Sequence, residues 1–120
     1  EGKRGERMKK EYRIKSTREF SSIMNYKKFY ACPSFTIYVK PRQQEHARVG
    51  ISAGKKLGNA VTRNRLKRRI RHILMELDDQ LAQDVDFIVI ARSPIVQMSY
   101  QEMKSSMMHV LKLATLLPKN

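Results

Sequence analysis

Two segments of the chain combine a helix-capping pair with apolar residues at helical spacing. Ser16 is followed three positions later by Glu19, and Ser99 is followed in the same way by Glu102, which is the pattern of a capping box. Behind each pair, apolar side chains recur every three to four residues, as on the buried face of an amphipathic helix. We therefore predict a first helix over residues 17–26 and a last helix from Ser99 to about residue 117.

The longest apolar periodicity follows Asn59, a residue that favours the N-cap position of a helix. Apolar side chains continue at helical spacing over about five turns, namely Leu66, Ile70, Ile73, Leu74, Leu77 and Leu81. At ~100° per residue, the opposite side carries polar and basic side chains, namely Asn64, Arg65, Arg68, Arg71 and His72. We expect the apolar stripe to cover a sheet while the basic face stays in solvent.

Three further segments have the character of strands. Residues 35–39 and 49–53 alternate apolar and polar side chains, so each is predicted to bury one face, and the short connection between them predicts a hairpin. Residues 85–91 are nearly all apolar and β-branched, which is typical of a strand buried on both faces. In the first strand, the alternation turns Tyr38 away from the core face of Phe35, Ile37 and Val39.

The succession of these elements, a helix, two or more strands, the long helix, a strand and a last helix, predicts an α+β fold in which helices pack on a small mixed sheet. With a third strand before the long helix, the order is α-β-β-β-α-β-α. A length of 120 residues and an apolar content of 41% suit one compact domain with a modest core. We assign this domain to residues 8–120. Residues 1–7 precede Met8 and lack apolar periodicity, so we interpret them as an upstream leader outside the fold.

Basic residues far outnumber acidic ones in the chain, which carries a net charge of +14. Residues 46–75 contain nine Lys or Arg and no Asp or Glu. Such a segment repels itself unless a polyanion supplies the missing negative charge, which predicts an RNA-binding or DNA-binding domain. No run approaches the ~18 apolar residues of a membrane span, and no signal-peptide core is present, so we expect a cytoplasmic protein that does not enter the membrane.

The residues that lead into the long helix are arranged to hold phosphates. Lys55, Lys56 and Gly58 precede a helix N-terminus, whose free backbone N–H groups and dipole favour an anion. Arginines then repeat along the first turns, and each guanidinium can hold two phosphate oxygens or stack on a base. A solvated helix surface would usually carry acidic partners four residues away, and this segment has none. The pattern suits a folded RNA with irregularly spaced phosphates.

Other functions of small basic proteins need features that this chain mostly lacks. A protein-only nuclease would need a metal or acid–base cluster, but His46, His72 and His109 lack metal-site spacing, so we predict no catalytic side chain and no metal site. No helix-turn-helix pattern supports a DNA-binding module, and a membrane-surface helix would use an apolar face that the core needs. A ribosomal protein, which is also small, basic and bound to RNA, stays open.

The segment from Lys55 to Arg68 resembles the signature of a known family. Its sequence, Lys-Lys-Leu-Gly-Asn-Ala-Val-Thr-Arg-Asn-Arg-Leu-Lys-Arg, is similar to the motif of the protein subunit of bacterial ribonuclease P. The resemblance covers residues 8–117 and includes Tyr12-Arg13-Ile14-Lys15, Val49-Gly50-Ile51-Ser52 and Ile88-Val89-Ile90-Ala91-Arg92. It implies a left-handed crossover through the long helix, whereas ~98% of such connections between parallel strands are right-handed.

The resemblance also implies a function. Ribonuclease P is a ribonucleoprotein endonuclease that matures the 5′ end of tRNA, and its RNA subunit cuts the precursor with divalent metal ions such as Mg²⁺. The implied partners are ribonuclease P RNA and precursor tRNA. The protein itself would carry no cofactor, would need no protein partner and would act as an accessory subunit.

The resemblance further implies two RNA-contacting surfaces. The long helix and the loop before it would lie against the catalytic RNA, through Lys55, Lys56, Asn59, Arg63, Asn64, Arg65, Lys67, Arg68 and Arg71. A cleft between the first helix and the sheet would hold the single-stranded 5′ leader, through Phe20, Met24 and Tyr38, with Arg13, Lys15 and Arg48 as phosphate contacts. Aromatic rings suit a leader of variable sequence because every base offers a π-face. Met24 stands where the family pattern would place a second aromatic, and Phe20 is also consistent with a plain core residue.

Overall fold

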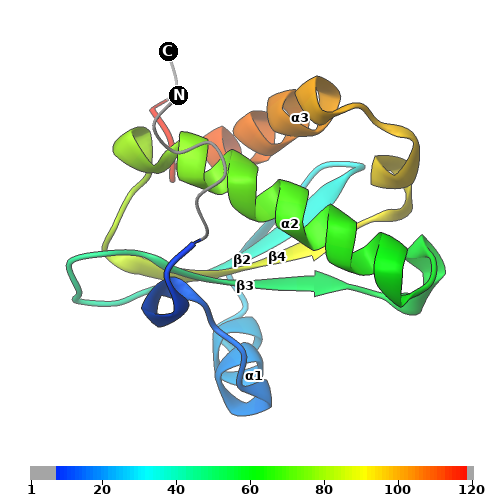
Figure 1. The fold of residues 1–120 in the computed structure, drawn as a ribbon. Helices are drawn as coiled ribbons and strands as arrows, with labels where there is room; N and C mark the ends of the chain where they lie inside the picture. Colours follow the sequence, from blue (N-terminus) through cyan, green and yellow to red (C-terminus); the bar gives the residue numbers. More distant parts are fainter. Residues whose placement is uncertain (1–7, 119–120) are drawn as a thin grey trace.

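The computed structural model describes residues 8–118, so the interpretation of residues 1–7 lies outside the described chain. Within this range the helices and strands follow the predicted order (Figure 1). The α-helices are α1 (Thr17–Asn25), α2 (Ala60–Glu76) and α3 (Tyr100–Leu113). The strands are β1 (Phe29–Ala31), β2 (Phe35–Pro41), β3 (Arg48–Ala53) and β4 (Val85–Ala91).

The four strands form one mixed sheet in the order β1-β2-β4-β3. β2 runs antiparallel to both β1 and β4, whereas β3 runs parallel to β4. The hairpin predicted between residues 35–39 and 49–53 is therefore wrong, because β4 lies between β2 and β3. Val89 of β4 stands opposite Ile37 on one side and Ile51 on the other. The continuous apolar run of β4 favours such a central position in the sheet. With β4 between them, β2 and β3 cannot pair directly.

The connection from β3 to β4 is a left-handed crossover. In Figure 1, β3 runs from left to right, the chain returns above the sheet through α2, and β4 runs in the same direction behind β3. This is the hand that the family resemblance implies and the opposite of the usual one. The connection carries the chain from the end of β3 into residues 54–58, which we call the basic loop, and then into the N-terminus of α2.

Each α-helix begins at the capping residue that the sequence indicates. The side chains of Ser16, Asn59 and Ser99 each accept a hydrogen bond from the backbone N–H three residues later. At Ser99 the capping box is complete, because Glu102 also accepts a hydrogen bond from the Ser99 backbone N–H at 2.8 Å. Local side-chain chemistry therefore fixes the starts of these helices.

The ends of α2 and α3 differ from the predicted ones. α2 stops at Glu76, and a 3-10 turn over Asp78–Gln80 follows, although the side chain of Leu81 still reaches the core. α3 stops at Leu113, and the chain turns at Thr115, whose φ is 57°. Apolar periodicity thus marks the residues that are buried more reliably than it marks the helix end. None of the described helices has the length and apolar character needed to cross a bilayer.

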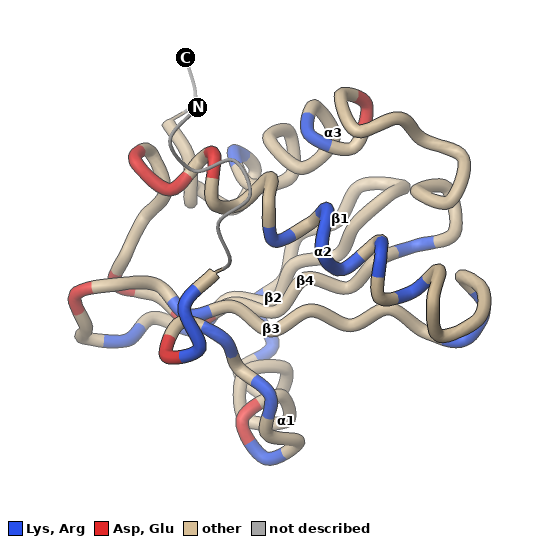
Figure 2. Tube along the Cα trace, viewed as in Figure 1, with Lys and Arg blue, Asp and Glu red and all other residues tan. Residues whose placement is uncertain are grey.

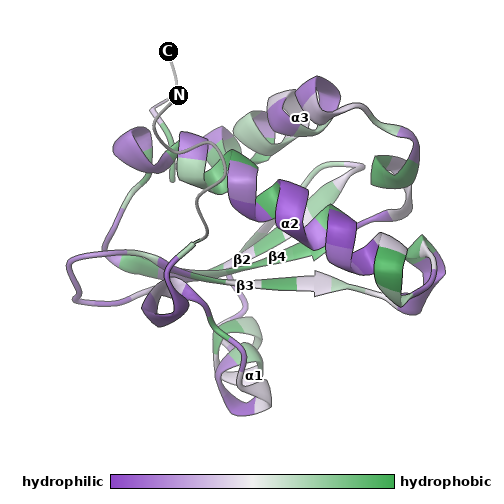
Figure 3. Cartoon of the chain, viewed as in Figure 1, coloured by the Kyte–Doolittle hydropathy of each residue, from purple (hydrophilic) through white to green (hydrophobic). Residues whose placement is uncertain are grey.

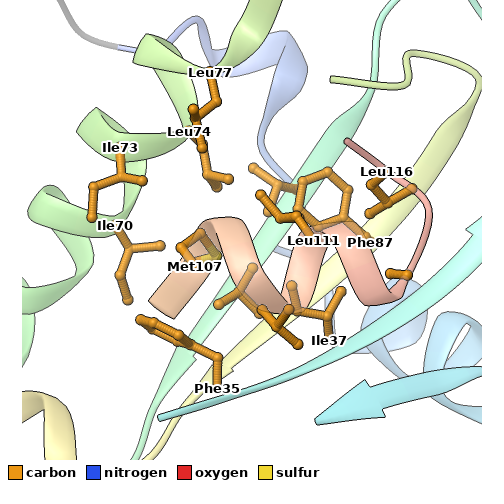
Figure 4. Packing of buried hydrophobic residues seen from close by; sticks show 14 of the residues in the cluster. Phe35, Ile37, Ile70, Ile73, Leu74, Leu77, Phe87, Met107, Leu111 and Leu116 are labelled. Atoms are coloured by element: carbon orange, nitrogen blue, oxygen red, sulfur yellow. The ribbon is translucent and has the colours of Figure 1, made fainter. Parts of the chain in front are cut away.

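The main hydrophobic core lies between one face of the sheet and the helices α2 and α3. Figure 3 shows that α2 presents apolar residues on one side and hydrophilic residues on the other. Met103 and Met107 of α3 are fully buried and fill part of this core. Figure 4 shows the residues that meet there, among them Phe35, Ile37, Ile70, Ile73, Leu74, Phe87, Met107 and Leu111.

A smaller apolar cluster occupies the opposite face of the sheet, which α1 covers (Figure 1). Ile14, Ile23 and Ile88 are buried there, and Phe20 and Tyr38 pack against them. Because Ile88 lies on this side while Phe87 and Val89 belong to the main core, β4 is buried on both faces, as its sequence indicates. We call this side of the sheet, together with α1, the α1 face.

Candidate nucleic-acid interface

Local hydrogen bonds shape the basic loop that precedes α2. Gly58 has a φ of 137°, a conformation that favours glycine, and its carbonyl oxygen accepts a hydrogen bond from Nε of Arg63 at 3.2 Å. The side-chain oxygen of Asn59 is occupied as the helix cap. Lys55 and Lys56 are exposed on the same loop. The loop thus presents two exposed ammonium groups beside a helix N-terminus, where an anion is favoured.

Basic side chains continue along the solvent side of α2, where Figure 2 shows a succession of blue segments. We call this set the basic row; it consists of Arg63, Arg65, Lys67, Arg68 and Arg71. All five are exposed or half-buried, as is Asn64 among them. No carboxylate within residues 8–118 forms an ion pair with any member of the row. The absence of acidic neighbours in the sequence is therefore preserved in three dimensions.

Arg13 joins the basic row from another part of the chain. It pairs with Val49 through an isolated parallel bridge, which brings it beside α2. Burial lowers the pKa of Arg71, and the positive charges of Arg13 and Arg68 lower it further. Nε of Arg13 is buried and has no hydrogen-bond partner among the described residues. A phosphate beside Arg13 and Arg71 would relieve the repulsion between these positive charges.

Two hollows meet at Arg13 and Arg71. One, of about 500 Å³, lies between α1, β3 and α2, and its polar lining includes Lys15 and Lys67 while Phe20 contributes an aromatic wall. The other, of about 830 Å³, lies along α2 and is lined by Arg13, Asn64, Arg65, Arg68, Arg69, Arg71, His72 and Tyr100, among others. The structure therefore brings Arg13, Lys15 and Phe20, which were predicted for the leader, next to residues predicted for the catalytic RNA.

Phe20 lies across β3 because Gly50 leaves room for its ring. A Cβ atom at Gly50 would stand 2.7 Å from Cζ of Phe20 and 2.8 Å from Cδ1 of Ile88, which is closer than such atoms approach. Phe20 is half-buried, so its ring serves the small core and also remains partly accessible in the hollow beside Arg13. Both interpretations of Phe20 are compatible with this position. Met24, one turn further along α1, is half-buried.

Tyr38 lies on the α1 face, as the alternation in its strand indicates. Its ring packs against the same small cluster as Phe20 and remains half-buried. It does not line the 500 Å³ hollow, which opens toward β3, whereas Tyr38 belongs to β2 and neighbours β1. The two aromatic residues therefore share one face of the sheet but occupy different parts of it.

Arg48 is tied to carboxylates rather than free for a phosphate. Its Nη2 lies 2.8 Å from Oδ2 of Asp86 and 2.9 Å from Oε2 of Glu19, and its Nε donates to Oδ1 of Asp86 at 3.1 Å. These contacts join β3, β4 and α1. In this structure Arg48 fixes the position of α1 on the sheet, and its predicted role as a leader contact stays a prediction.

Sequence reasoning overlooked Tyr100, which lines the hollow along α2. Its hydroxyl donates to Oε1 of Glu76 at 2.7 Å and lies 3.1 Å from Nδ1 of His72. Burial raises the pKa of Tyr100, and the hydrogen bond to Glu76 raises it further. Lys104 also pairs with Glu76 at 3.3 Å. These contacts join α2 to α3, and Tyr100 and Glu76 are 24 positions apart in the sequence. No local sequence pattern indicates contacts over such a separation.

Within residues 8–118, no group of three or more His, Cys, Asp or Glu side chains is placed to hold a metal ion. The basic row lies instead along a helix beside two hollows. Together with the mixed sheet, this arrangement defines a small α+β domain of the RNA-binding class.

Comparisons with known proteins give the family. The family model described as Ribonuclease P matches residues 8–115. A ribonuclease P protein component from Streptococcus pyogenes is 52% identical over 112 residues, which is 93% of each chain. The structure of the Staphylococcus aureus RNase P protein superposes with a TM-score of 0.82 at 38% identity, covering 88% of this chain and 97% of that one. The Thermotoga maritima RNase P protein, at 24% identity and a TM-score of 0.77, shares the fold over 83% of this chain and 94% of its own.

The chain belongs to the ribonuclease P protein family. It is thus the protein component of the endoribonuclease that matures the 5′ end of tRNA, and it associates with the RNA subunit of that enzyme. Membership excludes the ribosomal protein that the composition alone left open. It also accounts for a surface rich in unpaired cations.

Proposed function

We propose that the basic row and the loop before it bind the catalytic RNA, while the α1 face receives the 5′ leader of precursor tRNA. The RNA-binding set is Lys55, Lys56, Asn59, Arg63, Asn64, Arg65, Lys67, Arg68 and Arg71. The leader-binding set is Arg13, Lys15, Phe20, Met24 and Tyr38, with Arg48 as the residue that holds α1 in place. The protein does this work in the cytoplasm, where tRNA precursors are processed.

The observation that carries the proposal is the junction of the two surfaces at Arg13 and Arg71. The two guanidinium groups repel each other, and the partly desolvated Arg71 carries a lowered pKa. A phosphodiester that bridged them would gain charge-assisted hydrogen bonds on both sides. The leader and the catalytic RNA must come close together at the cleavage site, so a shared cationic junction is where such a protein would hold both.

The proposed chemistry assigns the cleavage to the RNA subunit and its divalent metal ions. The side chains of the protein bind and orient RNA and take no part in bond breaking. Positive side chains replace part of the ionic screening that Mg²⁺ otherwise provides between RNA strands. The protein should therefore matter most at low magnesium concentration.

The leader site is tested by Tyr38→Ala. If Tyr38 stacks on a leader base, the variant should lose roughly 1–3 kcal/mol of affinity for precursor tRNA and almost none for mature tRNA, which lacks the leader. The measurement is the ratio of the two affinities of the reconstituted holoenzyme, with folding checked by circular dichroism. Tyr38→Phe, which keeps the ring, is the matched control and should show the same ratio of precursor to mature tRNA affinity as the unaltered protein.

Equal losses for precursor and mature tRNA would mean that Tyr38 supports the fold or the docking of the RNA subunit. The leader would then have to lie elsewhere. Phe20→Ala is a poorer probe, because truncating a packed ring can by itself cost about 3–5 kcal/mol of stability.

A further inference from the structure

An exposed aromatic side chain stands beside Tyr38 at the edge of the sheet. Phe29 of β1 lies directly opposite Tyr38 in the antiparallel ladder, so the two side chains are on the same face. Their ring centroids are 5.4 Å apart and the ring planes are inclined by 34°. Phe29 is nevertheless 56% exposed, whereas phenylalanine is ordinarily among the most buried residues.

The surroundings of Phe29 are basic. Lys27 and Lys28 immediately precede it and are exposed, and Tyr26 before them is 49% exposed. Neither lysine forms an ion pair with a carboxylate of residues 8–118. β1 is an edge strand whose one neighbour among the described strands is β2, so its outer edge is available to an incoming chain. Exposed rings interleaved with unpaired lysines are the features by which proteins bind single-stranded nucleic acid.

We propose that Phe29 and Tyr38 form a two-ring platform on which nucleobases of the 5′ leader stack, with Lys27 and Lys28 neutralising the phosphates alongside. This inference rests on the proposed leader site and extends it from β2 to the sheet edge. The platform lengthens the bound stretch of leader beyond what Tyr38 alone would reach.

The ring geometry decides how a base can bind. A base inserted between two rings would need them about 7 Å apart, twice the ~3.4 Å rise of stacked bases, and the rings here are closer than that. A base must therefore stack on the outer, exposed side of the pair. Since Phe29 supplies more of that exposed area than the half-buried Tyr38, Phe29 is the principal stacking residue for the outer nucleotide.

A nucleic acid fits this surface better than a protein partner does. The apolar area is two rings at one strand edge, and the flanking charges are of one sign. An apolar protein interface would bury a broader patch with fewer lysines, because lysine is depleted at such interfaces. A single strand of RNA uses both features at once, the rings for bases and the ammonium groups for phosphates.

The test uses the holoenzyme, reconstituted with a bacterial ribonuclease P RNA, and precursor tRNAs whose leaders lengthen one nucleotide at a time. Phe29→Ala should lower affinity about tenfold for long leaders and leave mature tRNA and the shortest leaders unaffected. Phe29→Tyr, which keeps the ring, should behave like the unaltered protein. Val96→Ala, at a residue that is 45% exposed in the 3-10 turn Ser93–Gln97, removes exposed apolar surface elsewhere and should change nothing.

The outcomes separate this inference from the leader site itself. If Tyr38→Ala lowers the affinity for precursor tRNA but not for mature tRNA, while Phe29→Ala has no effect at any leader length, the platform is refuted and the leader site stands. If neither variant lowers the affinity for precursor tRNA relative to mature tRNA, the leader site fails as well. A loss that is the same for every leader and for mature tRNA, or a changed sedimentation of the free protein with unchanged tRNA affinity, would assign Phe29 to folding or to a protein contact and would also overturn the platform.

Discussion

Replacing Arg65 and Arg68 together by alanine is expected to weaken binding to the ribonuclease P RNA about a hundredfold, roughly tenfold for each lost charge-assisted contact. Both side chains are exposed on α2, and neither has a carboxylate partner within residues 8–118. Their free charges are available to phosphates, and their removal leaves the apolar stripe of α2 intact. The fold should therefore survive the change.

The dependence of this affinity on salt is the more specific measurement. Each lost phosphate contact should make the slope of log affinity against log salt concentration shallower by about one unit. Lys112→Ala removes a cation from α3, outside the basic row, and should leave the slope unchanged. An unaltered slope in the folded double variant would place the RNA-binding surface somewhere other than α2.

Asp86→Asn is expected to lower the free energy of unfolding by about 3 kcal/mol near neutral pH, because it leaves the guanidinium of Arg48 without its main partner. Asp86 is buried at 4% exposure, and both of its carboxylate oxygens lie within hydrogen-bonding distance of Arg48. Arg48 also forms an ion pair with Glu19 of α1, so the Asp86–Arg48–Glu19 group links α1 to the sheet. Its loss should loosen α1 before the main core, and urea unfolding at several pH values would measure the effect.

The pH dependence of this loss follows from the pKa of Asp86. Burial raises that pKa, but hydrogen bonds from Arg48 and Gln44 and the charges of Arg48 and Arg42 outweigh burial, so the pKa lies below the ordinary value of 3.8. A carboxylate whose pKa is depressed in the folded state stabilises the fold above its unfolded pKa, and that stabilisation disappears as pH falls through the folded pKa.

The difference in the free energy of unfolding between the unaltered protein and Asp86→Asn should thus be constant from neutral pH to about pH 5 and shrink below pH ~4. Glu19→Gln is the matched control, since it removes the more exposed partner of Arg48 and should cost no more than about 1 kcal/mol. A loss of stability in Asp86→Asn that persists unchanged at low pH would show that the negative charge of Asp86 is not the source of the loss.

The parts of the fold that follow from the sequence are those set by local chemistry or by burial. Ser16, Asn59 and Ser99 cap helices in the structure as their spacing predicts, and the alternation in β2 places Tyr38 on the α1 face. The basic row was predicted from a run of cations without acidic residues. The prediction holds in the structure because no carboxylate within residues 8–118 forms an ion pair with the row.

The parts that could not be predicted depend on contacts between distant segments. The position of β4 between β2 and β3 reflects a pairing choice among strands of similar character, and the residues alone favoured a local hairpin. Only the family resemblance indicated the left-handed crossover. The ion pairs of Arg48 could not be predicted because its partners Glu19 and Asp86 are 29 and 38 residues away in the sequence. Phe29 was overlooked because three residues of an edge strand carry too little periodicity to place a ring beside Tyr38.

The most direct test of the whole account is cleavage of a precursor tRNA by a bacterial ribonuclease P RNA at low magnesium, with and without this protein. We expect that the protein alone leaves the precursor intact, that the RNA alone is nearly inactive under these conditions, and that the two together restore cleavage at the mature 5′ end. Restoration should be impaired by the double replacement of Arg65 and Arg68. Metal-dependent cleavage of the precursor by highly purified protein without RNA, or failure of the protein to restore cleavage, would contradict it.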